Sequence, residues 1–292
     1  MKEAVEQALG FGLSEFRRLK GGSSPNFKAV RSSDGLPFLV KLLPKERQWA
    51  YPILVAHLDE MRGTSAVRRV FIEAPEDVGD YKLICLEWCE GAVKMPYQLT
   101  APQLREFVDF YVRFSKSFQR VSYVAEADSL SRWRDNILAC RGVVAAPVRR
   151  FILRELPEIE CTYRVEEMRT IFGDFHHGNV LFRDGRVHRV LDLESFCRGY
   201  PTDDLVRYFT CAYDHLKWAA PFRRGAMLRA FAETLQYAPY SRHEWIVSLN
   251  SIILRRLSDV VDHPNNPFFV ANLLYRVRFY LDLKMVVSRI LQ

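Results

Sequence analysis

One stretch in the second half of the chain, IFGDFHHGNVLFRDGRVHRVLDLE at 171–194, constrains the fold more than any other. The segments NVLF and RVLDLE are β-prone, and the RDGR between them is a turn of the Asp-Gly kind, so together they predict a short hairpin. Such a hairpin brings Asn179 and Asp192 to the same end. Asp174 lies in the loop that precedes it, five residues before Asn179. Three polar side chains are therefore expected at one place.

These polar residues are of the types that phosphate chemistry needs. Asn179 and Asp192 form a candidate Mg²⁺ site, because that ion takes few protein ligands and completes its shell with water and phosphate oxygens. Asp174, just upstream, can accept the proton of an attacking hydroxyl. This division of labour is typical of phosphoryl transfer, in which the protein positions the reactants and does little covalent chemistry.

The stretch resembles the catalytic centre of the aminoglycoside phosphotransferase and choline kinase family, which are protein-kinase-like phosphotransferases. The family pattern is an Asp followed five residues later by Asn in a loop, and then a hairpin that leads to Asp-x-Glu. The resemblance implies that Asp174 is the catalytic base and that Asn179 and Asp192 hold Mg²⁺. Glu194 matches the acidic residue that commonly follows the metal aspartate. Family members usually carry His where this chain has Phe172, at a position that packs against the loop and supports it.

The resemblance extends on the C-terminal side of this stretch. GYPTDDLVRYF matches the family segment in which an aspartate supports the catalytic loop, and Asp204 is the better match for that structural role. His176 and His177 could suggest a metal site, but adjacent histidines point in different directions and no third ligand is suitably spaced. We interpret them as residues that pack the loop or face the substrate.

In the N-terminal half, LKGGSSPNFKAV resembles the loop that covers the nucleotide, where backbone N–H groups cradle phosphates, so Gly22, Ser23 and Ser24 are predicted to bind it. In FLVKLL, Lys41 matches the lysine that holds the α and β phosphates. The alternative is that Lys41 lies on the solvent face of its strand. The apolar residues on both sides of it favour the inward position.

The lysine of this family usually pairs with a glutamate on the following helix. Glu46 falls early on that helix and Glu60 falls late, and we favour Glu46. LICLEWCEG resembles the family's hinge, whose backbone groups contact the adenine edge. Glu87, Trp88 and Cys89 are therefore predicted to contact the nucleotide through their main chain.

The order of elements indicates a β-rich lobe joined to a larger helical lobe. The resemblance implies that this is an α+β, protein-kinase-like fold with two lobes. We expect an opening helix at 2–9, strands at 16–19, 27–31 and 37–43, a helix at 45–61, and strands at 67–74 and 80–88. Helical periodicity dominates from residue 100 onward, except near the central motif. The predicted division is a nucleotide-binding lobe at 1–91 with a hinge at 87–91, and a helical lobe at 92–292 with the catalytic loop and the acceptor pocket.

Composition and missing motifs exclude several classes of protein. Hydrophobic residues make up 49% and charged residues 26% of the chain, which is typical of a globular protein and not of a disordered one. No apolar run is long enough for a membrane span and no signal peptide is recognisable, so we expect a cytoplasmic location. HExxH, GxSxG, GxxxxGK[ST] and GxGxxG motifs are absent from the sequence, which argues against zinc proteases, esterases, P-loop enzymes and Rossmann oxidoreductases.

The leading hypothesis is an enzyme that transfers the γ-phosphoryl group of ATP, with GTP as an alternative, to a hydroxyl of a small molecule. Amino sugars, sugars, choline-like amines and anionic glycans are all compatible acceptors. The net charge of +7 and the many arginines of the second half leave room for an anionic acceptor, whereas nucleic acid is not expected. A protein acceptor is disfavoured, because the chain from LDLESF to RGYPTDDL leaves little room for a peptide-docking segment. The alternative from another class is a nucleotide-binding pseudokinase that acts as a scaffold.

Overall fold

The structure is a computed structural model of the chain from Met1 to Gln292. It describes all residues except 20–23, 62, 65–66, 68–69, 73–76, 126–129, 140–145, 217–218 and 264.

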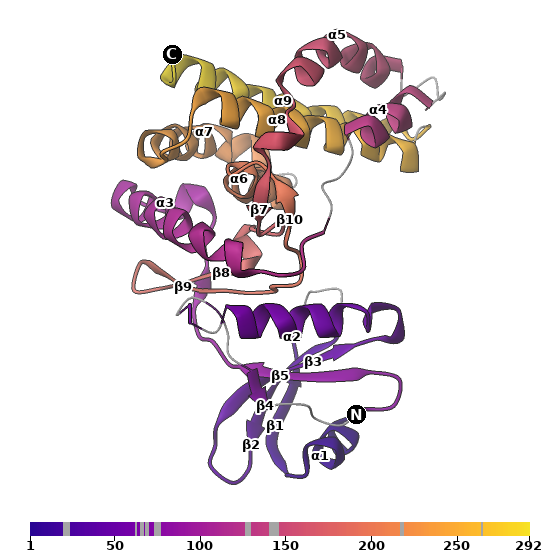
Figure 1. Cartoon of the computed structure of the whole chain (residues 1–292), viewed down its shortest axis with the longest axis vertical. Helices are drawn as coiled ribbons and strands as arrows, with labels where there is room; N and C mark the ends of the chain where they lie inside the picture. The colour runs from indigo at the N-terminus through magenta and orange to yellow at the C-terminus, as the bar shows by residue number, and fades with distance from the viewer. Residues whose placement is uncertain are drawn as a thin grey trace.

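The N-terminal part is an antiparallel sheet with the strand order β1-β2-β3-β5-β4, and helices α1 and α2 pack on its opposite faces (Figure 1). Its elements are α1 (Lys2–Leu9), β1 (Leu13–Arg18), β2 (Asn26–Arg31), β3 (Pro37–Leu43), η1 (Lys45–Arg47), α2 (Ala50–Glu60), β4 (Val70–Ile72) and β5 (Lys82–Glu87). The expected meander, inserted helix and two further strands are therefore confirmed.

The helix after β3 begins later than the sequence pattern predicts. A helix from residue 45 would place Pro52 in its interior, where the missing N–H would break the hydrogen-bond ladder. With the start at Ala50, Pro52 falls in the first turn, in which no N–H donor is needed. Residues Lys45–Arg47 instead form the short 3₁₀ helix η1.

Strand β3 is buried on both faces, and this sets the direction of its lysine. Val40 packs in one cluster with Val5 of α1, whereas Leu39 packs in the other cluster with Leu54 of α2. Because successive strand residues point to opposite faces, Lys41 points to the same side as Leu39. That side faces the rest of the chain (Figure 1).

The C-terminal part is mainly helical and holds two small sheets, β6-β8-β9 and β10-β7. Its strands and short helices are β6 (Ala92–Val93), η2 (Pro96–Gln98), η3 (Lys116–Arg120), η5 (Val165–Glu167), β7 (Arg169–Ile171), η6 (His177–Asn179), β8 (Val180–Arg183), β9 (Arg186–Val190), β10 (Cys197–Gly199) and η8 (Asp259–Asp262). Its α-helices are α3 (Ala101–Ser115), α4 (Leu130–Ala139), α5 (Ala146–Thr162), α6 (Asp203–His215), α7 (Ala220–Tyr237), α8 (Arg242–Ser258) and α9 (Pro267–Ile290). Among the described residues, no helix is both long and apolar enough to cross a membrane.

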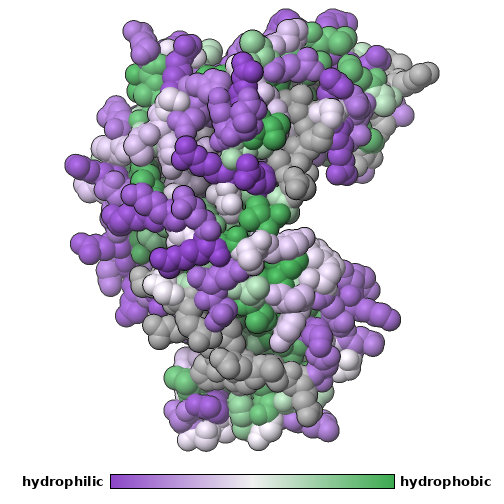
Figure 2. Space-filling model, viewed as in Figure 1, coloured by the Kyte–Doolittle hydropathy of each residue, from purple (hydrophilic) through white to green (hydrophobic). Residues whose placement is uncertain are grey.

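The chain passes from the first sheet to the second within a few residues. Strand β5 ends at Glu87, and β6, which pairs with β8 of the second sheet, begins at Ala92. The lobe boundary that we propose at residue 91 falls in this passage. Figure 2 shows the molecule hollowed on one side between the two parts.

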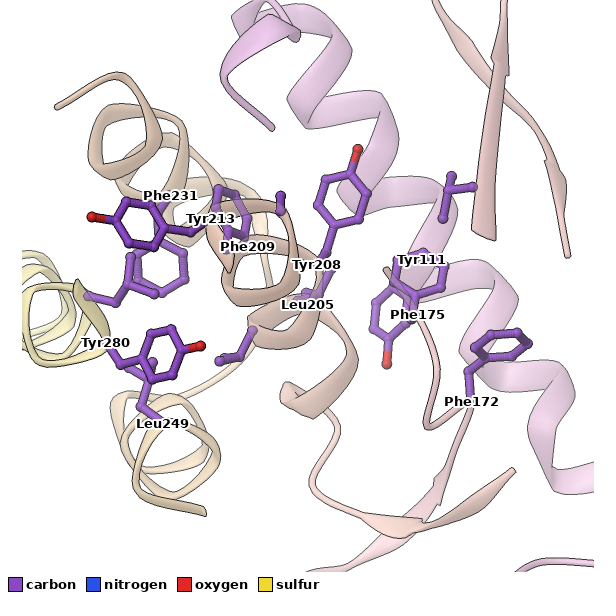
Figure 3. Packing of buried hydrophobic residues seen from close by; sticks show 14 of the residues in the cluster. Tyr111, Phe172, Phe175, Leu205, Tyr208, Phe209, Tyr213, Phe231, Leu249 and Tyr280 are labelled. Atoms are coloured by element: carbon purple, nitrogen blue, oxygen red, sulfur yellow. The ribbon is translucent and has the colours of Figure 1, made fainter. Parts of the chain in front are cut away.

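Helix α6 lies at the centre of the main hydrophobic core (Figure 3). Tyr208 of α6 lies 4.5 Å from Phe107 of α3 between ring centroids, and Phe209 lies 5.1 Å from Phe231 of α7. Aromatic side chains therefore pack against α6 from both sides. This packing fixes the position of the start of the helix.

The predicted hairpin is confirmed. Strands β8 and β9 pair antiparallel, with Arg183 opposite Arg186 at the turn. Asp184 and Gly185 both have positive φ, 50° and 78°, as a two-residue type I′ turn requires.

A buried carboxylate at the start of α6 holds the loop that follows β7. Asp204 is fully buried and accepts hydrogen bonds from the backbone N–H of Phe172 (2.8 Å), the backbone N–H of Gly173 (2.9 Å) and the hydroxyl of Tyr111 (3.0 Å). Burial raises the pKa of the Asp204 carboxyl to about 6, although these three donors act in the opposite direction. At pH 7 the group is still mainly ionised and can hold all three donors.

Replacing Asp204 with alanine leaves these three donors buried without an acceptor. We expect Asp204→Ala to lower the free energy of unfolding by about 3 kcal/mol, measured by urea denaturation. Tyr111→Phe removes one donor and keeps the carboxylate, so it should cost about 1 kcal/mol. Equal losses in the two variants would contradict a role for Asp204 as the anchor of the loop.

Candidate active site

The loop after β7 brings Asp174 and Asn179 together. The Asn179 side-chain amide donates to the backbone carbonyl of Asp174 at 3.1 Å and to its carboxylate oxygen Oδ2 at 3.0 Å. The loop needs Gly173, whose φ is +79° and where a Cβ would lie 2.2 Å from the carbonyl oxygen of Ser195. The hydrogen bonds from Asn179 and the tight turn at Gly173 therefore both fix the position of Asp174.

Asn179 and Asp192 meet at the same end of the hairpin, as the turn predicts. The backbone N–H of Leu191 donates to the carbonyl oxygen of Asn179 at 2.8 Å. Asp192 has a positive φ of 55°, a conformation that costs free energy for a residue other than glycine and is often found at functional sites. The Asp192 side chain is 44% exposed. The Asn179 amide nitrogen already donates to Asp174, so each of the two side chains offers oxygen as a possible metal ligand. This donor set fits Mg²⁺, which prefers oxygen ligands and needs few from the protein.

Lys41 joins the two parts of the chain at this site. Its ammonium is buried and lies 3.1 Å from Asp192 Oδ1 and 2.8 Å from Glu194 Oε2. The expected pairing of Lys41 with Glu46 is wrong. Glu46 is exposed in η1, whereas the Lys41 side chain points to the C-terminal part of the chain. The glutamate partner comes from the segment after β9 instead of from the helix after β3.

Arg47 is a further cation of the site that the sequence motifs do not single out. It donates through Nη2 to Glu194 Oε1 at 2.9 Å and through Nη1 to the hydroxyl of Ser24 at 3.2 Å. Ser24 is buried beside it, whereas Gly22 and Ser23 lie outside the described residues. Glu194 is thus held between two cations, Arg47 and Lys41.

His57 of α2 connects this helix to the segment that carries Asp192 and Glu194. It is fully buried, and its ring nitrogens lie 2.6 Å from the carbonyl oxygen of Leu193 and 2.9 Å from that of Tyr123. Leu193 separates Asp192 from Glu194, so α2 is attached to the backbone of the segment that carries the two acidic partners of Lys41. The sequence offers no signal for this contact beyond a histidine on the buried face of the helix.

The two adjacent histidines lie close to Asp174 but have different surroundings. His176 Nε2 is 3.7 Å from Asp174 Oδ2, and His176 Nδ1 accepts from the backbone N–H of Gly178 at 3.0 Å. The ring of His177 packs 4.9 Å from that of His215. Burial lowers the pKa of both histidines, and that of His177 falls to about 4, so His177 is neutral at pH 7. No group of three or more His, Cys, Asp or Glu side chains that could hold a metal occurs in the described part of the chain.

The predicted hinge lies at the end of β5. Glu87 is half-buried, and its carboxylate lies 3.4 Å from the guanidinium of Arg189 in β9. Cys89 is buried and its thiol donates to the backbone carbonyl of Glu87, while the ring of Trp88 lies under the ammonium of Lys28 at 5.2 Å. The main-chain contacts of these residues with a nucleotide remain a prediction.

Arg207 is the second cation that the motifs miss. It lies one turn after Asp203 and Asp204 on α6, and its Nη1 is 3.6 Å from Asp174 Oδ1. Its signal in the sequence is the helical spacing alone, because i and i+4 positions share one face of a helix. Asp174 therefore has both a cation and an amide as neighbours.

The pairing of Lys41 with Glu194 can be tested against the pairing with Glu46. We expect Glu194→Gln to lower the free energy of unfolding by about 2 kcal/mol, less than for a fully buried isolated pair because Asp192 still contacts Lys41. Glu46→Gln, the matched control at an exposed glutamate, should change it by less than about 0.5 kcal/mol. Urea denaturation of both variants measures the difference, and a larger loss for Glu46→Gln would overturn the assignment.

Comparison with known proteins finds similarity to a family model and to solved structures. The sequence model described as the phosphotransferase enzyme family matches residues 15–242. No curated protein matches the chain in sequence. A microcompartment-associated aminopropanol kinase is similar in structure, with a TM-score of 0.64, 15% identity, and 99% of each chain covered. An amicoumacin kinase bound to AMP-PNP and Ca²⁺ has a TM-score of 0.63 at 12% identity, covering 97% of this chain and 93% of its own. A choline kinase from Streptococcus pneumoniae has a TM-score of 0.59 at 12% identity, covering 96% of this chain and 97% of its own. The chain belongs to the phosphotransferase enzyme family.

Proposed function

We propose that this phosphotransferase moves the γ-phosphoryl group of ATP to a hydroxyl of a small molecule. The observation that carries the proposal is the convergence of four polar residues from distant parts of the chain. Lys41 lies 3.1 Å from Asp192 Oδ1, and Asn179 lies 3.0 Å from the carboxylate of Asp174. In this proposal the site combines a lysine for the phosphates, a base and a pair of metal ligands, which are the groups that phosphoryl transfer requires.

Asp174 serves the acceptor in this proposal. Its carboxylate accepts the proton of the acceptor hydroxyl while the hydroxyl oxygen forms a bond to the γ-phosphorus and the bond to the leaving ADP oxygen breaks. The amide of Asn179 holds Asp174 Oδ2, and Arg207 lies beside Oδ1, so the carboxylate is oriented before the acceptor arrives. Orientation of this kind lowers the barrier by removing the entropy cost of aligning the reactants.

The other half of the site serves the nucleotide. Asn179 and Asp192 would hold Mg²⁺, which neutralises charge on the phosphates when it is bound. Lys41 would place its ammonium on the α and β phosphates, and Arg47 beside Ser24 is placed to add a second positive charge. The backbone at Glu87, Trp88 and Cys89 would contact the adenine, with GTP as the alternative base. Similar structures solved with AMP-PNP and with ADP support ATP as the donor.

The first test replaces the proposed base. Asp174→Asn should reduce turnover by about 10²–10⁴-fold, because the amide cannot accept the proton, while leaving the affinity for ATP and Mg²⁺ intact. ADP formation with a panel of hydroxylated small molecules measures turnover, and titration calorimetry measures binding.

The matched control is Asp184→Asn at the hairpin turn, where the side chain is 93% exposed and asparagine tolerates the positive φ. This variant should keep full turnover. Undiminished turnover in Asp174→Asn would overturn the assignment of the base. Nucleotide binding without turnover on any acceptor by the unmodified protein would favour the pseudokinase alternative.

A further inference from the structure

Helix α2 carries one fully buried histidine, His57, on the side that faces the C-terminal part (Figure 1). Its two ring nitrogens meet two different segments of that part. Nδ1 lies 2.6 Å from the carbonyl oxygen of Leu193, and Nε2 lies 2.9 Å from the carbonyl oxygen of Tyr123. Both contacts are therefore with backbone carbonyls and not with a carboxylate.

The two segments that His57 contacts are joined to each other. Ala125 forms a parallel bridge with Cys197. The backbone N–H of Ala125 donates to the carbonyl oxygen of Phe196 at 2.9 Å, and the backbone N–H of Arg198 donates to that of Ala125 at 3.0 Å. The ring of Phe196 also packs edge to face with that of His57, with 4.9 Å between centroids. His57 is thus enclosed between α2 and a pair of connected segments.

The two contacts determine which ring nitrogens carry hydrogen. A carbonyl oxygen only accepts hydrogen bonds, so each contact needs an N–H group on the ring. Neutral histidine has one N–H group and one nitrogen with a lone pair, and that lone pair would face a carbonyl oxygen at hydrogen-bonding distance. Two facing acceptors repel each other, and a buried polar group without a partner is costly. Only the doubly protonated imidazolium satisfies both carbonyls.

The charge of such an imidazolium is stabilised mainly by its two carbonyl acceptors, because hydrogen bonds from an ionised donor are stronger than those between neutral groups. Glu60, three residues later on α2, adds negative charge beside one of the two segments, where its carboxylate accepts from the backbone N–H of Ser122 at 3.1 Å. In the other segment, Asp192 and Glu194 already pair with Lys41. Helix α2 therefore presents an acceptor to a backbone N–H and a donor to two backbone carbonyls.

The contact with Leu193 bears on two carboxylates of the site. Leu193 lies between Asp192 and Glu194, whose side chains lie 3.1 Å and 2.8 Å from the ammonium of Lys41. The φ of 55° at Asp192 costs free energy, so this conformation needs support from its surroundings. The hydrogen bond from His57 supplies such support at the next carbonyl. Without it, the peptide unit that joins Leu193 to Glu194 could rotate and move these carboxylates.

We propose that His57 is an imidazolium with both ring nitrogens protonated, and that it positions the segment 192–194 by holding the carbonyl of Leu193. The protonation of the ring follows from its contacts alone. The positioning role rests in addition on the proposed function, because Asp192 and Lys41 would hold the metal and the nucleotide. In this role His57 acts through Leu193 and contacts neither reactant.

NMR of the full chain, labelled with nitrogen-15 at histidine, tests the protonation of the ring. The chain has seven histidines, and the signals of His57 are identified by their absence in His57→Asn. At pH 7 we expect a bonded hydrogen on both ring nitrogens of His57. A ring nitrogen of His57 without hydrogen would show that the imidazolium is wrong.

Two variants separate the two contacts of the ring. The side-chain amide nitrogen of asparagine can take the place of Nδ1, and that of glutamine the place of Nε2. His57→Asn therefore keeps a donor for Leu193, whereas His57→Gln keeps one for Tyr123. We expect His57→Gln to weaken the binding of Mg²⁺ with a non-hydrolysable ATP analogue by about 10–100-fold, as for the loss of a charged hydrogen bond, and His57→Asn by less than about threefold. Titration calorimetry of the full chain measures both affinities.

A role in stability alone would not separate these two variants, because each loses the charge and one of the two hydrogen bonds. The temperature of thermal unfolding should therefore fall by a similar amount in both, while the nucleotide affinity differs between them. The matched controls are His243→Asn and His243→Gln, at a histidine of α8 whose side chain is 45% exposed. Both controls should bind the nucleotide as the unmodified chain does.

Equal losses of affinity in His57→Asn and His57→Gln, or a larger loss in His57→Asn, would overturn the positioning role. ADP formation with a panel of hydroxylated small molecules, measured in the same samples, keeps this inference separate from the proposed reaction. Binding that follows the expected order of the variants, without ADP formation by the unmodified chain, supports the role of His57 and counts against phosphoryl transfer. Failure of the unmodified chain to bind Mg²⁺ and nucleotide would overturn both, while the NMR result still decides the protonation of the ring.

Discussion

The ion pairs of Lys41 are the interaction on which the rest of the site depends. A buried ammonium is costly unless it is paired, and the partners of Lys41, Asp192 and Glu194, come from a segment some 150 residues further along the chain. The pairs therefore fix the sheet of the N-terminal part against the hairpin of the C-terminal part. His57 adds a second attachment by contacting the carbonyl oxygen of Leu193, between those two carboxylates. The opposed charges that would hold a nucleotide and its metal also join the two parts.

The loop that carries Asp174 is held by buried groups, and not by ion pairs between the two parts of the chain. Asp204 anchors the backbone at Phe172 and Gly173 from a helix that the aromatic core surrounds. Phe172 is itself fully buried and packs 5.4 Å from Phe196 between ring centroids. The backbone at Phe172 and Gly173 is thus held by a buried carboxylate, while the Asp174 side chain is partly exposed to solvent. This arrangement suits the role of base that we propose for Asp174.

The sequence predicts what is decided locally and misses what tertiary packing decides. The hairpin follows from Asp184 and Gly185, and the inward direction of Lys41 follows from the apolar residues on each side of it. The partner of Lys41 could not be found in this way, because Glu46 and Glu194 are the same residue type and only tertiary packing brings Glu194 to Lys41 and leaves Glu46 exposed in η1. Arg207 was missed for the same reason: its role depends on which face of α6 meets the loop. The late start of α2 could have been predicted from Pro52, because proline is tolerated in the first turn of a helix and not in its interior.

In the reaction that we propose, the nucleotide and the acceptor meet at Asp174, whose carboxylate lies 3.6 Å from Arg207. The most direct measurement is a crystal structure of the protein with Mg²⁺ and a non-hydrolysable ATP analogue. We expect the triphosphate on Lys41, the metal on Asn179 and Asp192, and the γ-phosphate facing Asp174. A triphosphate bound away from Lys41, or a metal that contacts neither Asn179 nor Asp192, would contradict it.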